Sequence, residues 1–285
     1  MGINKIYLTG GEPFLYPRLP EVLAFVYGQR SLELYVSTNG TLISTVEAVL
    51  LKDTGAKAQV SIDGPEAYHD LVRGFKGSFR RASCGIQELV AARVPVAVVT
   101  TICQDNMALL PWLAEWAAGM GVGRLSVQPL LQLGRGSEIH CKKLVEEQLY
   151  DLFLQLSDLG YTYRSRGLRF SLAYRTRRFL LAHPCAAYVC NGTGCHRKVT
   201  KEIKKLVIRE DGTVLPEIPT LDYRFALGNL HQSTLTELVA RYFDNGYAQF
   251  DRLCRTVYKE VMPTWTSPII PWNEIVSERS HTFDA

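Results

Sequence analysis

Lys5-Ile6-Tyr7-Leu8-Thr9 is a β-rich run that ends at Gly10-Gly11-Glu12-Pro13, and this junction sets the pattern for the first half of the chain. Further predicted strands follow at residues 32–37, 57–62, 94–102 and 124–128. Amphipathic helical patterns lie at residues 17–28, 44–52, 78–92, 107–118 and 142–159. This alternation predicts parallel strands with right-handed crossovers, in a barrel or a doubly wound sheet. In both architectures the active site lies at the carboxyl ends of the strands.

Composition narrows the class of protein. Of the 285 residues, 47 % are apolar and 21 % are charged, which is typical of a globular chain with a sizeable core. The formal charge of +4 is too small to indicate a nucleic acid or membrane partner. The start of the chain lacks the pattern of a signal peptide. With seven cysteines, an odd number, these features favour a reducing, cytoplasmic location.

The second half of the chain has a different pattern. Residues 161–174 predict one or two strands, and residues 205–216 predict a hairpin that turns at Asp211-Gly212. Helices are expected at residues 233–243 and 248–258, and the last 25 residues, rich in Pro and Trp, are expected to be irregular. Ser44 and Glu47 have the spacing of a capping box at the start of a first-half helix. We therefore expect two domains, residues 1–160 and 161–285.

Polar residues follow the first three predicted strands. They are Gly10, Gly11, Glu12 and Pro13, then Ser37, Thr38 and Asn39, and then Ser61, Asp63 and Arg73. The glycines let backbone groups approach a ligand, and a carboxylate beside them suits an ammonium group. Arg73 has the planar fork that clamps a carboxylate. Each group also has an ordinary interpretation, as a tight turn, a strand-end cap or a surface ion pair.

The combination of these motifs resembles the radical S-adenosylmethionine (SAM) superfamily, in particular its branch with a C-terminal SPASM or twitch extension. The resemblance rests on residues 6–19, 36–42 and 61–79 and on Gln128-Pro129 with Gly134-Arg135-Gly136, and it resumes at the hairpin and at Gly228-Asn229-Leu230. It implies an α/β fold, a partial (β/α)6 TIM-like barrel followed by a small α+β extension. It also implies two cofactors, SAM and a 4Fe-4S cluster.

The resemblance assigns roles to the strand-end residues. Gly10, Gly11 and Glu12 match the stretch that binds the SAM amino group, and Ser61 and Arg73 match positions at its aminoacyl part, with Arg73 at the carboxylate. Asn39 matches a residue that lines the same pocket. The full set of expected cofactor-binding residues is Gly10, Gly11, Glu12, Pro13, Ser37, Asn39, Ser61, Asp63 and Arg73.

One defining feature of the family has no counterpart in this sequence. The Cys-x-x-x-Cys-x-x-Cys loop that holds the SAM-binding cluster is missing, and the match starts just before the family's second strand. We therefore expect a barrel without its first β/α unit, with five strands instead of six. A truncated start, a non-catalytic relative and a partner that supplies the cluster all remain open. Truncation is favoured because an unpaired edge beside residues 5–9 promotes aggregation.

Four later cysteines are the candidate metal ligands. A twitch-like auxiliary cluster would use Cys185, Cys190, Cys195 and Cys254, although Glu217 stands where the SPASM pattern after Gly212 has a cysteine. Cys185, Cys190 or Cys195 could instead donate a hydrogen atom to a substrate radical, or all could be thiols without a cofactor. We expect Cys84, Cys103 and Cys141 to have no partner.

The resemblance predicts an enzyme that cleaves SAM to a 5′-deoxyadenosyl radical and modifies a peptide or protein, with an external electron donor. The alternative is a cluster-free, non-catalytic module that binds a peptide or a partner enzyme. A barrel enzyme with a phosphate ligand is disfavoured, because Glu12 stands where a phosphate-binding loop would present backbone N–H groups alone.

Overall fold

The computed structural model describes residues 3–29, 31–130, 141–189, 203 and 205–283. The chain forms two compact units, Met1–Ala173 and Tyr174–Ala285. The division falls later than the predicted boundary near residue 160. The reason is that residues 169–172 form a strand of the first unit's sheet.

A six-stranded sheet forms the core of the first unit, and its strands lie side by side in chain order. All five neighbouring pairs are parallel. The strands are β1 (Lys5–Leu8), β2 (Glu33–Thr38), β3 (Lys57–Ser61), β4 (Val96–Ile102), β5 (Arg124–Pro129) and β6 (Arg169–Leu172). The α/β fold and the parallel, barrel-like arrangement are thus confirmed.

The predicted count of five strands was wrong, because β6 pairs with β5 from Arg124↔Arg169 to Val127↔Leu172. A strand was expected within residues 161–174, but as part of the second domain. Its four residues, Arg-Phe-Ser-Leu, do not indicate which sheet they join, and the pairing with β5 places them in the first unit.

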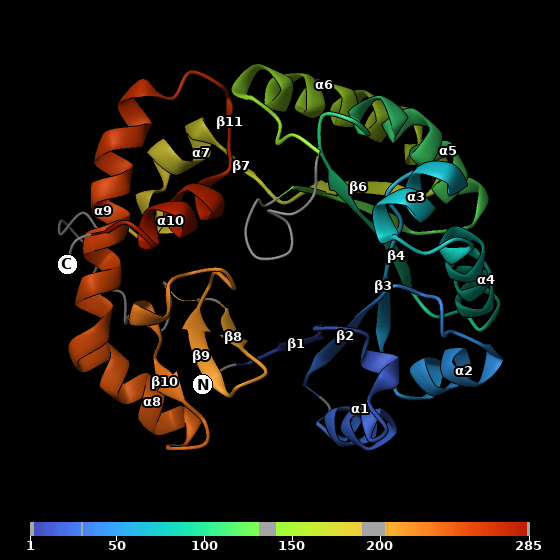
Figure 1. The fold of residues 1–285 in the computed structure, drawn as a ribbon, viewed down its shortest axis with the longest axis horizontal. Helices are drawn as coiled ribbons and strands as arrows, with labels where there is room; N and C mark the ends of the chain where they lie inside the picture. The colour runs from blue at the N-terminus through green and yellow to red at the C-terminus, as the bar shows by residue number, and fades with distance from the viewer. Residues whose placement is uncertain (1–2, 30, 131–140, 190–202, 204, 284–285) are drawn as a thin grey trace. The chain divides into compact units, whose positions relative to one another are not determined.

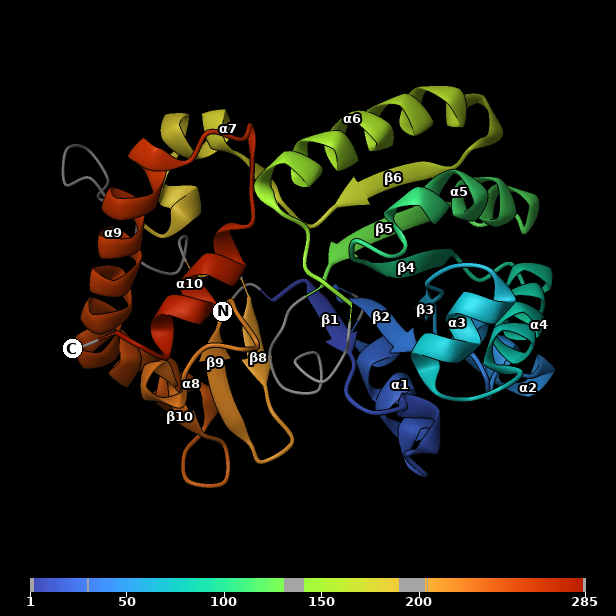
Figure 2. The same cartoon turned by 45° about the horizontal axis from the view of Figure 1, so that its top comes forward.

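Helices cover one side of the curved sheet (Figures 1 and 2). They are α1 (Leu19–Gly28), α2 (Thr45–Asp53), α4 (Ser78–Ala91), α5 (Leu110–Gly119) and α6 (Glu146–Thr162). Alternate strand residues such as Leu34, Val36 and Val60 are fully or almost fully buried, whereas Ser37 and Ser61 alternate with them and are half-buried. The predicted capping box is present in α2, where Glu47 accepts the Ser44 N–H at 2.8 Å.

β1 lies at an edge of this sheet. Within the described residues it pairs only with β2, and Tyr7, 47 % exposed, stacks on Tyr35 with ring centroids 4.6 Å apart. This edge therefore presents unpaired backbone groups in the part of the chain that the structure shows.

The second unit contains two small antiparallel sheets and several helices. Its elements are β7 (Arg175–Thr176), α7 (Arg177–Ala182), β8 (Leu206–Ile208), β9 (Thr213–Pro216), β10 (Gly228–Asn229), α8 (Leu235–Arg241), α9 (Tyr247–Thr264), β11 (Ile269–Ile270) and α10 (Trp272–Ser280). The hairpin β8–β9 is confirmed, with Gly212 at a φ of +81°. The expectation of an irregular end was wrong, because Trp272 and Val276 of α10 pack into the core.

No helix in the described parts of the chain is both long enough and apolar enough to cross a membrane.

Gly85 of α4 is a point of close packing behind the second strand. A Cβ atom there would overlap the carbonyl oxygen of Gly40 and lie 3.0 Å from Ile43 Cβ. Gly40, at the turn after β2, has a φ of +76°. The helix therefore supports the turn that carries Asn39 only if position 85 has no side chain.

We predict that Gly85→Ala lowers the free energy of unfolding by about 1–2 kcal/mol, because overpacking outweighs the better helix propensity of alanine. Chemical denaturation of the full chain measures this change. The matched control is Gly119→Ala in α5, where a Cβ would meet nothing within 4 Å. Equal effects of the two substitutions would contradict the packing argument.

Candidate functional site

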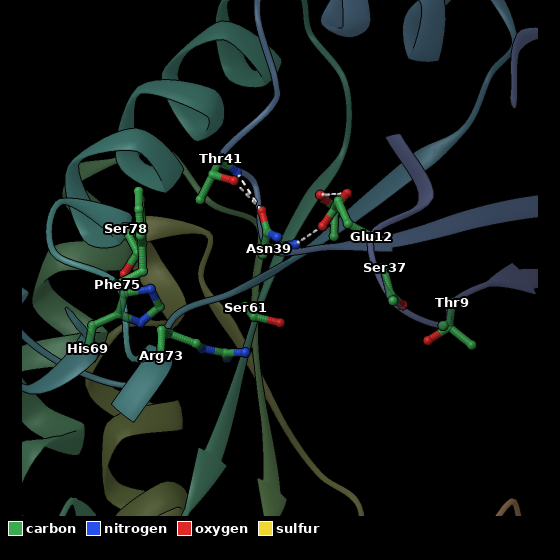
Figure 3. Close-up of a pocket in the computed structure, with 13 residues that line it drawn as sticks. Thr9, Glu12, Ser37, Asn39, Thr41, Ser61, His69, Arg73, Phe75 and Ser78 are labelled. Atoms are coloured by element: carbon green, nitrogen blue, oxygen red, sulfur yellow. Dashed lines mark hydrogen bonds between the residues drawn. The ribbon is translucent and has the colours of Figure 1, made fainter. Parts of the chain in front are cut away.

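A pocket of about 560 Å³ lies at the carboxyl ends of β1, β2 and β3 (Figure 3). Seven of the predicted cofactor-binding residues line it: Gly10, Gly11, Glu12, Ser37, Asn39, Ser61 and Arg73. Its lining also includes Thr38, which the sequence placed among the polar strand-end residues but not in the cofactor set. The other lining residues, to which we assigned no role from the sequence, are Thr9, Thr41, His69, Phe75 and Ser78. Pro13 and Asp63 do not line the pocket. Pro13 begins a short 3-10 helix, and Asp63 lies buried beside Arg73.

The Glu12 carboxylate is fixed by the end of the neighbouring strand. Thr38 Oγ1 donates to Glu12 Oε1 at 2.6 Å, and the Asn39 N–H donates to Oε2 at 2.8 Å. Gly10, with a φ of +134°, provides the turn that brings the side chain to this position. The two donors fix the orientation of the carboxylate, so Glu12 presents its oxygens to the pocket in one position.

The Asn39 side chain is used partly for local structure. Its Oδ1 accepts from the Thr41 N–H at 2.8 Å and from Thr41 Oγ1 at 2.7 Å (Figure 3). This is the turn-capping role that an Asn-Gly sequence suggests. The Nδ2 group makes no hydrogen bond to any described residue, which leaves its donors available to a ligand.

Arg73 reaches the pocket from α3 (Glu66–Arg73), a helix that the sequence did not predict. Its Nε and Nη2 both lie 2.8 Å from Asp63 Oδ2. The Arg73 side chain is 34 % exposed and the Asp63 side chain only 3 %. Asp63 therefore anchors one edge of the guanidinium, and the remaining donors of the fork can bind a carboxylate.

His69 lies beside this ion pair and is 1 % exposed. Its Nδ1 accepts the Asp63 N–H at 3.1 Å, which requires an unprotonated Nδ1. Burial is the main cause that lowers the pKa of His69 from its ordinary value, and Arg73 adds to the effect against the opposing pull of Asp63. His69 is thus an uncharged residue of the pocket lining near pH 7.

The candidate metal ligands of the second unit are only partly visible. Cys190 and Cys195 lie outside the described residues. Cys185 is half-buried in a 3-10 helix, and Cys254 is fully buried on α9. Burial raises the pKa of the Cys254 thiol and disfavours the thiolate that a cluster needs. The proposed auxiliary cluster and the hydrogen-donor role of these thiols therefore stay predictions.

Two cysteines of the first unit differ from expectation. Cys103 and Cys141 form a disulfide, although the sequence led us to expect no partner for either. Spacing along the chain gives no sign of the pair, because 38 positions separate the two residues and the fold brings them together. Cys84, on α4, is exposed and forms no disulfide with a described residue.

The fold and this pocket define the first unit as an α/β domain with a polar, charge-paired site at the carboxyl edge of a parallel sheet. The sequence profile of the Radical SAM superfamily matches residues 1–111. These residues, which include the whole lining of the pocket, are similar to the radical SAM superfamily.

Individual relatives show the same similarity. The chain is 30 % identical over 164 residues to the AdoMet-dependent heme synthase of Oleidesulfovibrio alaskensis, a match that covers 57 % of this chain and 42 % of that protein. It is 33 % identical over 138 residues to the sporulation killing factor maturation protein SkfB of Bacillus subtilis, covering 48 % of this chain and 33 % of that protein. The chain thus spans less than half the length of these curated relatives.

A solved structure shows the same fold over most of the chain. SuiB of Streptococcus suis, bound to S-adenosylmethionine, aligns with a TM-score of 0.66 and 17 % identity, over 87 % of this chain and 57 % of SuiB. The same protein bound to its precursor peptide SuiA aligns with a TM-score of 0.65 and 16 % identity, over 87 % of this chain and 56 % of SuiB.

We predict that His69 makes stability depend on pH below about 6.5. The unfolded chain takes up a proton at the ordinary histidine pKa of 6.5, whereas the folded chain does so only at lower pH. The contribution is therefore fully present above pH 6.5 and is lost as the pH falls towards the folded pKa, by at most about 1.4 kcal/mol per pH unit.

Unfolding free energies at pH 7.5 and 5.5 measure this effect. His69→Gln should reduce the difference between the two pH values, and His231→Gln, at an exposed histidine, should not. An NMR titration that places the His69 pKa at or above 6.5 would contradict the burial argument.

Proposed function

We propose that this chain contains the SAM-binding part of a radical SAM enzyme that modifies a peptide or protein. The observation that carries the proposal is the placement of Glu12 and Arg73 around one pocket at the strand ends. An amino-acid head carries an ammonium and a carboxylate, and these two side chains complement both charges.

The residues fit the aminoacyl part of SAM in three respects. Glu12 is held in position by hydrogen bonds from Thr38 and Asn39, and its carboxylate can accept hydrogen bonds from the ammonium. Arg73 keeps donors of its guanidinium fork for the carboxylate while Asp63 orients it. Gly10 and Gly11 have open space where a Cβ would stand, so backbone groups there can approach a ligand closely.

The same pocket does not fit an iron–sulfur cluster by itself, because none of the described residues that line it is a cysteine. In the family, the 4Fe-4S cluster supplies the electron that cleaves SAM to a 5′-deoxyadenosyl radical. The described residues contribute binding and orientation of SAM, and the thiolates for that cluster would come from outside this set.

The peptide substrate is supported by two of the proteins that this chain resembles. SkfB is a maturation protein for a killing factor, and SuiB has been solved with its precursor peptide. A cluster-free binding module is the alternative. Iron content, together with release of 5′-deoxyadenosine from SAM under anaerobic, reducing conditions, decides between the two functions. If the full product of the gene neither binds iron nor cleaves SAM, the enzyme is excluded.

We predict that Arg73→Lys weakens SAM binding by about 10- to 100-fold, because lysine keeps the charge but loses the fork that contacts Asp63 and a carboxylate together. Isothermal titration calorimetry of the chain with SAM measures the change. Arg80→Lys is the matched control, since Arg80 pairs with Glu66 and its side chain is 77 % exposed.

Glu12→Gln should weaken binding as well, because the amide presents no negative charge to the ammonium. If the Arg73 and Glu12 variants bind SAM as the wild type does, the pocket is not the SAM site.

A further inference from the structure

The disulfide Cys103–Cys141 joins two segments at the carboxyl edge of the sheet. Cys103 directly follows β4, and Cys141 lies in the connection between β5 and α6. Both cysteines are buried with Leu130 in a small cluster of their own. Next to the disulfide, the Gln104 N–H donates to Lys142 O at 3.0 Å, and Gln104 Nε2 donates to Lys143 O at 2.9 Å. The sulfur pair thus fastens the chain after β5 to the end of β4.

Two contacts connect this cross-link to residues 63–73, which carry Asp63 and Arg73 and are called the Asp63–Arg73 arm below. The first is Tyr68 of α3, whose hydroxyl lies 3.5 Å from Cys103 Sγ. Burial, together with the charges of Asp105 and Asp63, raises the pKa of Tyr68 to about 12, so the hydroxyl keeps its proton. Tyr68 is one position before His69 and lies on the same helix as Arg73, and both of these residues line the pocket.

The second contact is Asn106, which is buried. Its Oδ1 accepts the Cys103 N–H at 2.8 Å, and its Nδ2 donates to Asp63 O at 3.1 Å. Asp63 in turn holds the Arg73 guanidinium. The disulfide therefore touches both the helix that presents Arg73 and the loop that presents its counter-ion.

We propose that Cys103 and Cys141 form a thiol–disulfide exchange site, whose oxidised form fixes the Asp63–Arg73 arm at the pocket and whose reduced form loosens it. The proposal concerns the arm's geometry and does not depend on SAM chemistry. The co-reactant is a low-molecular-weight thiol such as glutathione.

The exchange is balanced in atoms and electrons. A thiolate of the small molecule attacks one sulfur, forms a mixed disulfide and releases the other cysteine as a thiolate that takes up a proton. A second small thiolate attacks the mixed disulfide and releases the remaining cysteine. The products are two protein thiols and one small-molecule disulfide, so two electrons pass to the protein.

The charge of Asp105 should lower the rate of this exchange. Its carboxylate is exposed, and one of its oxygens lies with both sulfurs in a group whose atoms are all within 4.8 Å of one another. A negative charge there repels the attacking thiolate and disfavours the leaving one. Asp105→Asn should therefore speed reduction by glutathione by roughly threefold or more.

The test is made on the full chain in buffers with defined ratios of reduced to oxidised glutathione. Peptide mapping after alkylation should find residues 103 and 141 linked in oxidising buffer and both alkylated in reducing buffer. Hydrogen exchange of the α3 amides should be roughly threefold faster or more in the reduced protein. In the double variant Cys103→Ser with Cys141→Ser, hydrogen exchange of the α3 amides should be fast in both buffers. Cys84→Ser should behave as the wild type does.

Three results would overturn the proposal. One is that the two cysteines are unlinked in every buffer, and another is that reduction leaves α3 exchange unchanged. The third is that the reduced protein binds one Zn²⁺ that protects both thiols and is lost in Asp105→Asn, which would make the group a metal site. None of these measurements uses SAM, so they fail or succeed independently of the proposed function.

Discussion

A buried carboxylate organises the edge of the sheet on which the pocket is built. Asp63 follows β3 and accepts hydrogen bonds from Arg73 of α3 and from the Thr101 N–H of β4, at 2.8 and 3.1 Å. The Asp63 side chain is only 3 % exposed, and burying a carboxylate costs free energy unless its oxygens are paired. The two partners are therefore required, and they fix the positions of β3, β4 and α3 relative to one another. The position of Arg73 at the pocket is a consequence of that requirement.

At this site, the same residue can stabilise its own turn or ion pair and also help to bind a ligand. The Asn39 side chain caps its own turn through Thr41, and the Asn39 N–H also fixes Glu12 from the neighbouring strand. Likewise, Arg73 forms the ion pair that its sequence context suggested, and that ion pair is what orients its free donors. The capping interactions preorganise the charged groups, so a ligand does not have to order them when it binds.

The sequence predicted best those features that short stretches determine. The alternation of strands and helices, the capping box at Ser44 and the turn at Gly212 depend on neighbours in the chain, and each is present in the structure. The helix α3 and the Cys103–Cys141 pair were missed, and the strand expected within residues 161–174 was not assigned to the first unit's sheet. α3 follows Pro65 without a side-chain cap, and β6 and the cysteine pair depend on contacts between distant segments. The pocket itself was predictable because the carboxyl ends of adjacent parallel strands must meet.

The charges in the pocket and directly behind it favour one kind of ligand. Glu12 in the lining and the buried Asp63 behind Arg73 each carry one negative charge, Arg73 carries one positive charge, and burial keeps His69 neutral. The sum is one net negative charge, and the positive charge of Arg73 is largely compensated by Asp63 at 2.8 Å. A phosphate would be repelled by this balance. A zwitterionic head alone would leave one negative charge uncompensated, whereas SAM, with its ammonium, carboxylate and sulfonium, carries one net positive charge. The electrostatics thus favour the sulfonium form of the proposed ligand over its neutral thioether product, and this preference arises from the same buried carboxylate that positions the arginine.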